Sequence, residues 1–407
     1  MPMRCVIVSD FGAVNGGAAK VAIESARGLA EAGVDVVFAC AIGSVSKRLD
    51  HRRIEVQRFE GEEVWKVGGR IAAARQGIWN AAAHAFLTAL LKRQPPGTIV
   101  HLHQWTKAFS PAAIAAAAES GLPVAITLHD YFSICPTGGY FDFKAGRPCA
   151  RRPMSGGCMV ANCDRESYGH KLVRVARQWR SDTALRALRS PLFIHVSALA
   201  ARVAEPFLPT PSRHLVLANM IETTRLSPAD VAANRPALFL GRFTQEKGVL
   251  VAAAAARAAD IPLRLVGDGE AAIRAEIARL CPAAQFTGWV DAAAVIEAVR
   301  AARCVVAPSL WYETGPMTVA ETMAQGVPTI VSRTIGAAEA VAHGRNGFVV
   351  TAGDTADLTE SLKQIRRDDV VGPMGRAAYD DYWAKPQSVD RHVAGLQEAY
   401  GRLLAGA

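Results

Sequence analysis

The sequence has 407 residues, of which half are hydrophobic and a fifth are charged. This length suggests two or three domains, and this composition is ordinary for a folded soluble protein, which excludes a disordered tail and a fibrous protein. Lys and Arg outnumber Asp and Glu by 46 to 37, and this net charge of +9 leaves nucleic acid, a phosphorylated substrate and an anionic membrane surface as candidate partners.

Short apolar runs alternate with alanine-rich helical stretches along most of the chain. In the first half we expect helices over 18–32 and 111–119, and strands over 5–9, 34–39, 98–102, 124–128 and 193–196. In the second half we expect strands over 237–240, 263–266, 285–286, 304–307, 329–331 and 347–350. Continuous apolar strands separated by helices are typical of parallel sheets covered on both faces. Because a proline-containing stretch over 206–236 interrupts this rhythm, the sequence predicts two doubly wound α/β domains.

The longest stretch without Asp, Glu, Lys or Arg covers residues 76–91. It is shorter than the roughly 20 apolar residues of a transmembrane helix, so we expect a buried helix there. The first residues lead directly into a strand pattern, without the basic and apolar regions of a secretory signal. With eight cysteines and no such signal, we expect a reducing compartment, no disulfide framework and a cytoplasmic location.

The first candidate ligand-binding element is Asn15-Gly16-Gly17, between the first strand and the first helix. Glycines let a ligand approach the backbone, and a helix N-terminus presents free N–H groups to an anion. The spacing differs from the dinucleotide-binding fingerprint, and a plain turn is the alternative interpretation.

The second candidate element is the loop GRFTQEKG, which follows the expected strand at 237–240. It places Arg242 and Lys247 at the carboxyl end of a strand, where open α/β sheets bind ligands. Fixed cations at this position would stabilise the negative charge of a diphosphate leaving group. A solvated basic loop is the alternative interpretation.

The third candidate element is WYETGPMTVAE, after the expected strand at 304–307. Pro316 suits the first turn of a helix, which leaves the N–H groups of Met317 and Thr318 free to face a phosphate. We expect Glu321 on that helix and Glu313 on the preceding loop. Both carboxylates would then accept hydrogen bonds from sugar hydroxyls.

Together, GRFTQEKG, the LVGDGE turn and YETGPMTVAETMAQGVP resemble the family 4 glycosyltransferases, whose GT-B fold consists of two Rossmann-like domains facing a central cleft. NGGAAKVAIESARGLAEAGVDV is similar to the opening segment of that family, so the resemblance extends over nearly the whole chain. It implies an acceptor-side domain over 1–200 and a nucleotide-sugar-binding domain over 201–380. It also implies a helical segment over 381–407 that packs back on the first domain.

The resemblance implies roles for single residues. Arg242 and Lys247 match the pair that holds the donor diphosphate, Glu313 matches the glutamate that faces the transferred sugar, and Glu321 matches the glutamate on the nucleotide ribose. The other matches are a first-domain glycine loop (Gly16 and Gly17), a histidine near the reacting sugar carbon (His129) and the phosphate-facing backbone (Gly315, Pro316, Met317 and Thr318). For His129, a structural histidine at a strand end is the alternative interpretation.

The implied activity is transfer of a sugar from a nucleotide-sugar donor to a glycan or lipid-linked acceptor, with retention of anomeric configuration and without a metal or other cofactor for catalysis. It would serve the synthesis of cell-surface polysaccharide or glycolipid, and it needs no nucleic-acid partner. Two alternatives stay open. A GT-B sugar-nucleotide 2-epimerase would need a carboxylate set in the first domain. A zinc-dependent nucleic-acid-binding protein would explain the cysteines and the charge but leave Glu313 and Glu321 unexplained.

A glycine-rich insertion over 135–163 carries four cysteines, which are Cys135, Cys149, Cys158 and Cys163. Four thiolates can close a tetrahedral zinc site, but their spacing lacks paired C-x-x-C motifs. Some family 4 relatives carry a similar insertion. A structural zinc site and unliganded buried cysteines both stay open, with a disulfide pair as a third interpretation.

Residues 144–190 contain eleven Lys or Arg and three acidic residues. Within them, 171–189 has the pattern of a basic amphipathic helix, with apolar side chains at helical spacing (Leu172, Val175, Ala176 and Trp179). Such a helix suits an anionic membrane surface, with Arg174, Arg177 and Arg180 on the cationic face. The alternative is a helix packed on the domain with a solvated basic face.

Overall fold

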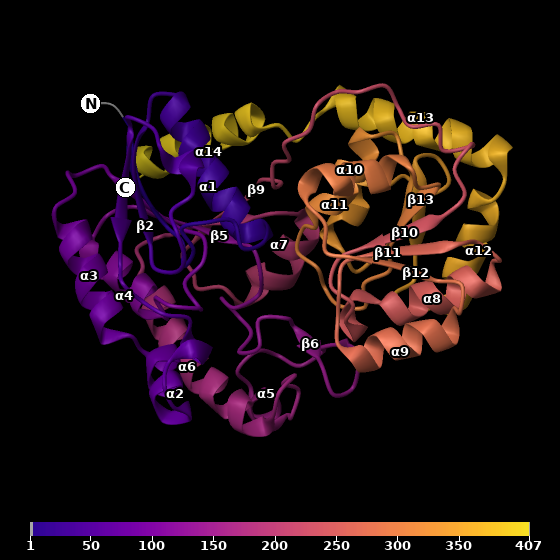
Figure 1. The fold of residues 1–407 in the computed structure, drawn as a ribbon. Helices are drawn as coiled ribbons and strands as arrows, with labels where there is room; N and C mark the ends of the chain where they lie inside the picture. The colour runs from indigo at the N-terminus through magenta and orange to yellow at the C-terminus, as the bar shows by residue number, and fades with distance from the viewer. Residues whose placement is uncertain (1–2, 407) are drawn as a thin grey trace. The chain divides into compact units, whose positions relative to one another are not determined.

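The computed structural model describes residues 3–406 and divides them into two compact α/β units (Figure 1). Unit 1 contains residues 3–144, 149–220 and 388–406, and unit 2 contains residues 145–148 and 221–387. The two expected α/β domains are therefore present. The first of them extends to residue 220 rather than 200, because a further strand joins its sheet, and it also includes the C-terminal segment from residue 388.

Unit 1 is built on a seven-stranded parallel sheet with the order β3-β2-β1-β4-β5-β8-β9. Its strands are β1 (Arg4–Val8), β2 (Asp35–Cys40), β3 (Ile54–Arg58), β4 (Ile99–Leu102), β5 (Val124–Leu128), β8 (Leu192–His195) and β9 (Arg213–Val216). Its helices are α1 (Gly17–Glu31), α2 (Arg70–Ile78), α3 (Ala81–Lys92), α4 (Ala112–Ser120), α5 (Gly156–Val160), α6 (Tyr168–Ala187), α7 (Ala198–Ala204) and α14 (Val389–Ala405). The short strands β6 (Phe141–Asp142) and β7 (Arg147–Pro148) lie in the cysteine-containing insertion.

Helices α1 and α14 lie side by side over one face of this sheet (Figure 1). The fully buried side chains of Leu396 and Tyr400 in α14 join a core that also contains Ile7 of β1 and Leu29 of α1. The last helix of the chain is therefore part of the hydrophobic core of unit 1.

The expected single helix over 76–91 is wrong, because the chain forms two helices there. Helix α2 ends at Ile78, and the Asn80 side chain accepts a hydrogen bond from the Ala83 N–H and so caps the N-terminus of α3. No helix within residues 3–406 is long and apolar enough to cross a bilayer.

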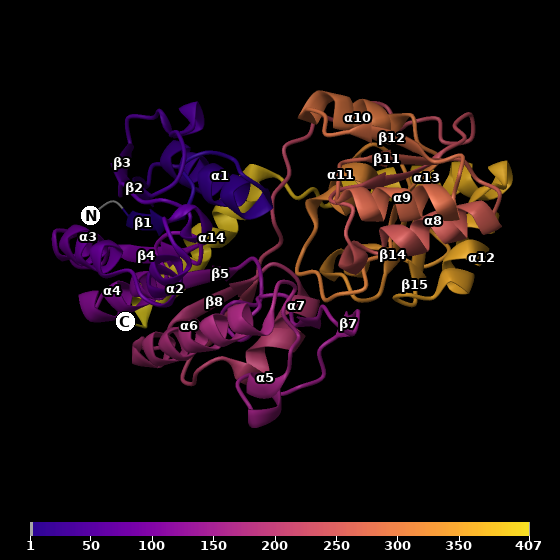
Figure 2. The ribbon, with the colours of Figure 1, turned by 60° about the horizontal axis from the view of Figure 1, so that its bottom comes forward.

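Unit 2 is built on a six-stranded parallel sheet with the order β12-β11-β10-β13-β14-β15. Its strands are β10 (Ala237–Leu240), β11 (Leu263–Val266), β12 (Gln285–Gly288), β13 (Cys304–Ala307), β14 (Thr329–Ser332) and β15 (Gly347–Val350). Its helices are α8 (Val249–Ala258), α9 (Ala271–Leu280), α10 (Ala292–Arg300), α11 (Met317–Ala324), α12 (Thr355–Ile365) and α13 (Asp368–Ala384). Figure 2 shows α8 and α9 side by side on the sheet, while α11 packs with α13 in a second core.

Candidate functional site

The candidate donor-binding residues of unit 2 follow the carboxyl ends of the neighbouring strands β10 and β13. The loop after β10 turns through a 3₁₀ turn, η4 (Gln245–Lys247), and enters α8 at Gly248, whose φ is +71°. A Cβ atom at Gly248 would lie 2.0 Å from the carbonyl oxygen of Pro308. Only glycine therefore lets the two loops pack this closely.

This close packing brings Lys247 and Glu313 together as an ion pair. The second Glu313 oxygen accepts a hydrogen bond from Ser309 Oγ at 2.8 Å. The Glu313 backbone is fixed from the loop after β14, since its N–H donates to the Thr334 carbonyl and its carbonyl accepts from the Gly336 N–H. Both the position and the orientation of the Glu313 carboxylate are thus determined by neighbouring strands of the sheet.

Glu313 is ionised in this arrangement. Burial raises the pKa of its carboxyl group, but the Lys247 ammonium and the hydrogen bonds from Lys247 and Ser309 outweigh burial and hold the pKa below its usual value. A charged acceptor and a charged donor therefore lie next to each other at the end of the sheet, where sugar hydroxyls and phosphate oxygens are their natural partners.

The remaining candidate residues of unit 2 surround this pair. Arg242 is exposed on the loop after β10. Pro316 lies immediately before α11 rather than within its first turn, and no side chain caps that helix end, so backbone N–H groups are the polar groups presented there. Glu321 lies on the second turn of α11, as expected, and its charge helps to raise the pKa of Tyr382, which burial raises most, to about 12.

Two candidate elements belong to unit 1. Gly16 and Gly17 are exposed where the loop after β1 enters α1, and Gly16 adopts a φ of +123° at the uncapped N-terminus of that helix. His129 directly follows β5. Both elements thus lie at the carboxyl end of the parallel sheet of unit 1, which is the edge that binds ligands in this type of sheet.

His129 contacts a second histidine that the sequence analysis did not single out. Its Nε2 lies 3.0 Å from Nδ1 of His103, the residue after β4, and the two rings are stacked. Burial lowers the pKa of His129 to about 3 and that of His103 well below its usual value. Both imidazoles are therefore neutral at pH 7, and one donates a hydrogen bond to the other. The sequence could have indicated this contact, since His103 and His129 directly follow two strands that are neighbours in the sheet.

Asp130, next to His129, is a second residue that the motifs did not identify. Burial raises the pKa of its carboxyl group to about 6, although a hydrogen bond from the Phe132 N–H opposes this shift. A carboxyl group that titrates near neutral pH at a strand end is typical of a functional site.

Two of the four cysteines of the insertion contact a buried lysine. Lys171 of α6 is fully buried, and its Nζ lies 3.3 Å from Cys163 Sγ and 3.8 Å from Cys158 Sγ. Cys135, Cys158 and Cys163 are buried, and all eight cysteines are free. Within residues 3–406 no group of three or more Cys, His, Asp or Glu side chains is arranged as metal ligands.

Helix α6 differs from the expected basic amphipathic helix. Its buried side carries the polar side chains of Lys171 and Gln178, whereas Leu172 is 49% exposed and Trp179 is 66% exposed. Helix α6 nevertheless packs on α2 and α4, as the alternative of a helix packed on the domain predicts, but Leu172 and Trp179 take no part in that packing.

Two of the three arginines expected on the cationic face of α6 have internal partners. Arg174 pairs with the buried Asp164 at 3.2 Å, and Arg177 donates to the Pro136 carbonyl and lies over the Phe132 ring. Burial lowers the pKa of Arg177 to about 10. Arg180, which lies 5.8 Å from the Trp79 ring, is exposed.

Two protein-family models match the chain. One, described as a "Glycosyl transferase 4-like domain", matches residues 16–156, and the other, described as "Glycosyl transferases group 1", matches residues 235–368. Both describe glycosyltransferases, which favours that function over the epimerase and the nucleic-acid-binding protein.

Among curated proteins, the phosphatidyl-myo-inositol mannosyltransferase of Mycobacterium leprae is 32% identical over 165 residues, which cover 38% of this chain and 44% of that protein. The match thus spans less than half of that relative.

Solved structures share the fold over the whole chain. Sucrose-phosphate synthase from Thermosynechococcus elongatus superimposes with a TM-score of 0.73 at 16% identity and covers 100% of both chains. Anabaena HepE, solved in complex with UDP and glucose, superimposes with a TM-score of 0.67 at 17% identity and covers 98% of this chain and 100% of its own. These similarities establish the arrangement of two Rossmann-like domains, while the roles of single residues stay predictions.

Proposed function

Because the chain belongs to the family 4 glycosyltransferases of GT-B fold, we propose that it moves a sugar from a nucleotide-sugar donor to a glycan or lipid-linked acceptor with retention of anomeric configuration. The observation that carries this proposal is the Lys247–Glu313 ion pair at the carboxyl end of the unit 2 sheet. It provides a cation for a leaving diphosphate and an ionised carboxylate for sugar hydroxyls at one position.

The leaving diphosphate develops negative charge as its bond to the sugar breaks. In our proposal Lys247, the exposed Arg242 and the backbone N–H groups at the start of α11 stabilise this charge, in the place that a metal ion takes in other transferases. Glu313 holds hydroxyls of the transferred sugar, and Glu321 holds the ribose. The diphosphate then accepts the proton of the attacking acceptor hydroxyl, so no side chain has to act as the base.

His129 fits this scheme as a neutral group in unit 1. A neutral imidazole that is held in place by His103 adds no positive charge near the reacting sugar. An imidazolium would instead repel the positive charge that develops on the sugar ring. The lowered pKa of His129, about 3, therefore suits a hydrogen-bonding role at every pH at which the enzyme works.

Nucleotide binding gives the first test of the donor site. We expect that at least one of UDP, GDP and ADP, or its sugar derivatives, raises the melting temperature by about 5–10 °C at 100 times its dissociation constant, which corresponds to about 2.7 kcal/mol. The free nucleosides uridine, guanosine and adenosine are matched controls and should have little effect, since Arg242 and Lys247 would hold phosphate. Flat melting curves with every nucleotide would contradict the proposed function.

For the acceptor, we propose a lipid-linked substrate that the enzyme reaches on an anionic membrane surface. The relative from Mycobacterium leprae is named for a lipid, phosphatidyl-myo-inositol. The exposed stripe of α6 (Tyr168, Leu172 and Trp179) combines two aromatic rings with an aliphatic side chain, and the exposed Arg165 and Arg180 lie on the same helix or just before it. Exposed apolar and cationic side chains on one helix are typical of interfacial binding.

Vesicle binding tests this surface. The double substitution Leu172→Ser/Trp179→Ser should weaken binding to phosphatidylserine-containing vesicles about tenfold or more, because burial of a large apolar side chain contributes about 1.5–3 kcal/mol. Trp289→Ser is the matched control, since Trp289 is 65% exposed and lies in unit 2. Equal binding by both variants would exclude α6 as the membrane-binding element.

The four cysteines remain a proposed structural zinc site. Their donor chemistry fits Zn²⁺, and no carboxylate in the described part of the chain lies within ion-pair distance of the buried Lys171 ammonium. If zinc were bound, Cys135, Cys149, Cys158 and Cys163 would hold it, and their thiolates would place negative charge near the Lys171 ammonium. The free state of all eight cysteines also suits the cytoplasmic location that we propose.

Elemental analysis tests the metal directly. Purified protein should carry about one zinc ion per chain, and Cys158→Ser/Cys163→Ser should remove the zinc and lower the melting temperature. Cys281→Ser, which changes a buried cysteine of unit 2, is the control and should keep the zinc. Protein that neither contains zinc nor takes it up on titration would contradict the proposed zinc site.

A further inference from the structure

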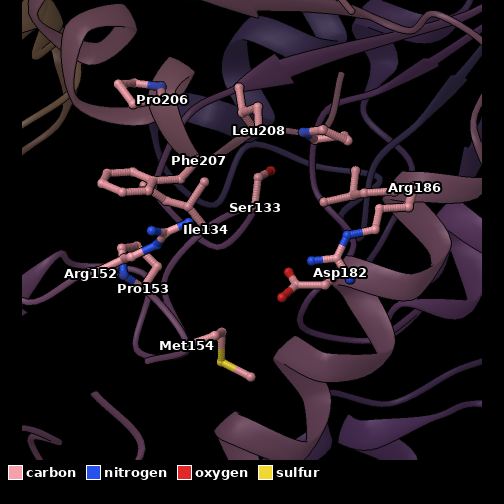
Figure 3. A pocket seen from close by; sticks show the side chains of 12 residues that line it. Ser133, Ile134, Arg152, Pro153, Met154, Asp182, Arg186, Pro206, Phe207 and Leu208 are labelled. Carbon is pink, nitrogen blue, oxygen red and sulfur yellow. The ribbon is translucent and has the colours of Figure 1, made fainter. Parts of the chain in front are cut away.

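A cavity of about 240 Å³ lies within unit 1 and contains none of the residues assigned above to the donor (Figure 3). Its wall combines the loop after β5, the cysteine-containing insertion, the second half of α6 and residues 206–209, which include part of a 3₁₀ turn, η3 (Glu205–Phe207). The cavity is smaller than the roughly 300–1,000 Å³ of pockets for drug-sized ligands, so it suits a single ring with one substituent.

One buried polar atom in this wall has no partner. Ser133 is 4% exposed, and its Oγ makes no hydrogen bond within the described chain. Figure 3 shows this hydroxyl among the side chains that surround the cavity. An unpaired buried hydroxyl costs roughly 1–3 kcal/mol, so Ser133 is placed where a bound ligand would satisfy it.

Three charged side chains provide further polar contacts. Figure 3 shows the Asp182 carboxylate beside the Arg186 guanidinium, opposite Arg152. Asp182 Oδ1 accepts a hydrogen bond from Gln178 Nε2 at 2.8 Å, and burial raises the pKa of the carboxyl group. With two guanidinium groups and one carboxylate, the cavity has an excess of positive charge and both kinds of hydrogen-bonding group.

The rest of the wall is apolar. The Phe207 ring, which is 37% exposed, faces the cavity with the buried side chains of Ile134 and Leu208. Apolar surfaces of this kind pack against the C–H groups of a sugar ring, while carboxylate, hydroxyl and guanidinium groups bond its hydroxyls.

The position of the cavity relates it to His129. Ser133 follows His129 by four residues, and four residues of fully extended chain span at most about 14 Å. The Cα atoms of Ser133 and His129 are therefore at most about 14 Å apart, so the cavity wall and the histidine proposed to act near the reacting sugar belong to one short loop.

We propose that this cavity binds a sugar residue of the acceptor that carries a phosphate or carboxylate group. Asp182 and Ser133 would hold its hydroxyls, Phe207 would pack on its ring, and Arg152 and Arg186 would bind the anionic group, as planar guanidinium groups do. This inference rests on the proposed transferase function and specifies its acceptor.

Isothermal titration of the full chain with methyl glucoside, methyl glucuronide and glucose 6-phosphate tests the inference. We expect at least one of the two anionic sugars to bind about tenfold more tightly than the neutral one, and Arg186→Gln to abolish that difference. Arg189→Gln is the matched control, since Arg189 is exposed on the same segment but does not line the cavity. The two anionic probes distinguish a phosphate from a carboxylate. Inorganic phosphate that binds as tightly as glucose 6-phosphate would contradict a sugar site.

Ser133→Ala separates a binding role from a structural one. Removal of an unpaired buried hydroxyl should leave the melting temperature unchanged or raise it, whereas affinity for the anionic sugar should fall several-fold. Unchanged affinity in this variant, or equal binding of neutral and anionic sugars by the unsubstituted chain, would overturn the inference. Nucleotide binding is measured in the same preparations. If no nucleotide binds, the proposed transferase function is contradicted. If a nucleotide binds but the sugars do not, only the proposal for the cavity is contradicted.

Discussion

Substitution of Lys247 by Met should lower the turnover number by about 10²–10³-fold, because a fixed donor to the developing negative charge is lost. The structure adds a cost in stability. Lys247 neutralises Glu313, and removal of one partner of a buried pair costs about 3–5 kcal/mol. Because the side chains of Lys247 and Glu313 remain 22% and 13% exposed, we expect a loss near or below the lower limit. Turnover and urea denaturation measure the two effects.

The double substitution Lys247→Met/Glu313→Gln separates stability from catalysis. It removes both charges, so it should recover most of the stability that Lys247→Met loses, yet turnover should stay as low as in the single variant or lower. Near-normal turnover by either folded variant would show that Lys247 does not face the leaving group.

Substitution of Gly248 by Ala should cause a large loss of stability. The new Cβ would meet the Pro308 carbonyl oxygen at 2.0 Å, and a backbone atom cannot move aside as a flexible side chain would. Overpacking costs about 1–3 kcal/mol, added to the roughly 1–2 kcal/mol of a left-handed residue that carries a Cβ.

Gly344→Ala is the control for backbone strain alone. Gly344 has a φ of +80°, and a Cβ atom there would meet no neighbouring atom within 4 Å, so only the conformational cost applies. The difference between the two variants in urea denaturation therefore measures the contact between the loops after β10 and β13. Equal losses would show that these loops do not pack as described.

Much of the fold could be predicted because buried parallel strands are apolar throughout. Strands β5, β10, β11, β13 and β15 occupy their predicted ranges. The strands β3 and β9 could not be predicted in this way, since both lie at the edges of the seven-stranded sheet. Their sequences, IEVQR and RHLV, keep charged and polar side chains that an edge position allows.

In the candidate site, too, some features could be predicted from the sequence and others could not. The motif positions of Lys247 and Glu313 indicated a shared ligand, but their mutual ion pair depends on the loop after β14, which no local pattern contains. The environment of Lys171 differs from the one that its sequence context predicts. Its place in a basic helix predicts a solvated cation, whereas it is buried against Cys158 and Cys163 of the insertion.

The place of α14 in the core of unit 1 has a consequence for how the protein is made. As the chain leaves the ribosome, residues 221–387 emerge completely before α14 does, so unit 2 has its whole sequence available while unit 1 still lacks a helix. Until then, the apolar surface that Leu396 and Tyr400 cover is open to solvent. The unit encoded first is therefore the last to complete its core, and until then its nascent form exposes an apolar surface to which chaperones bind.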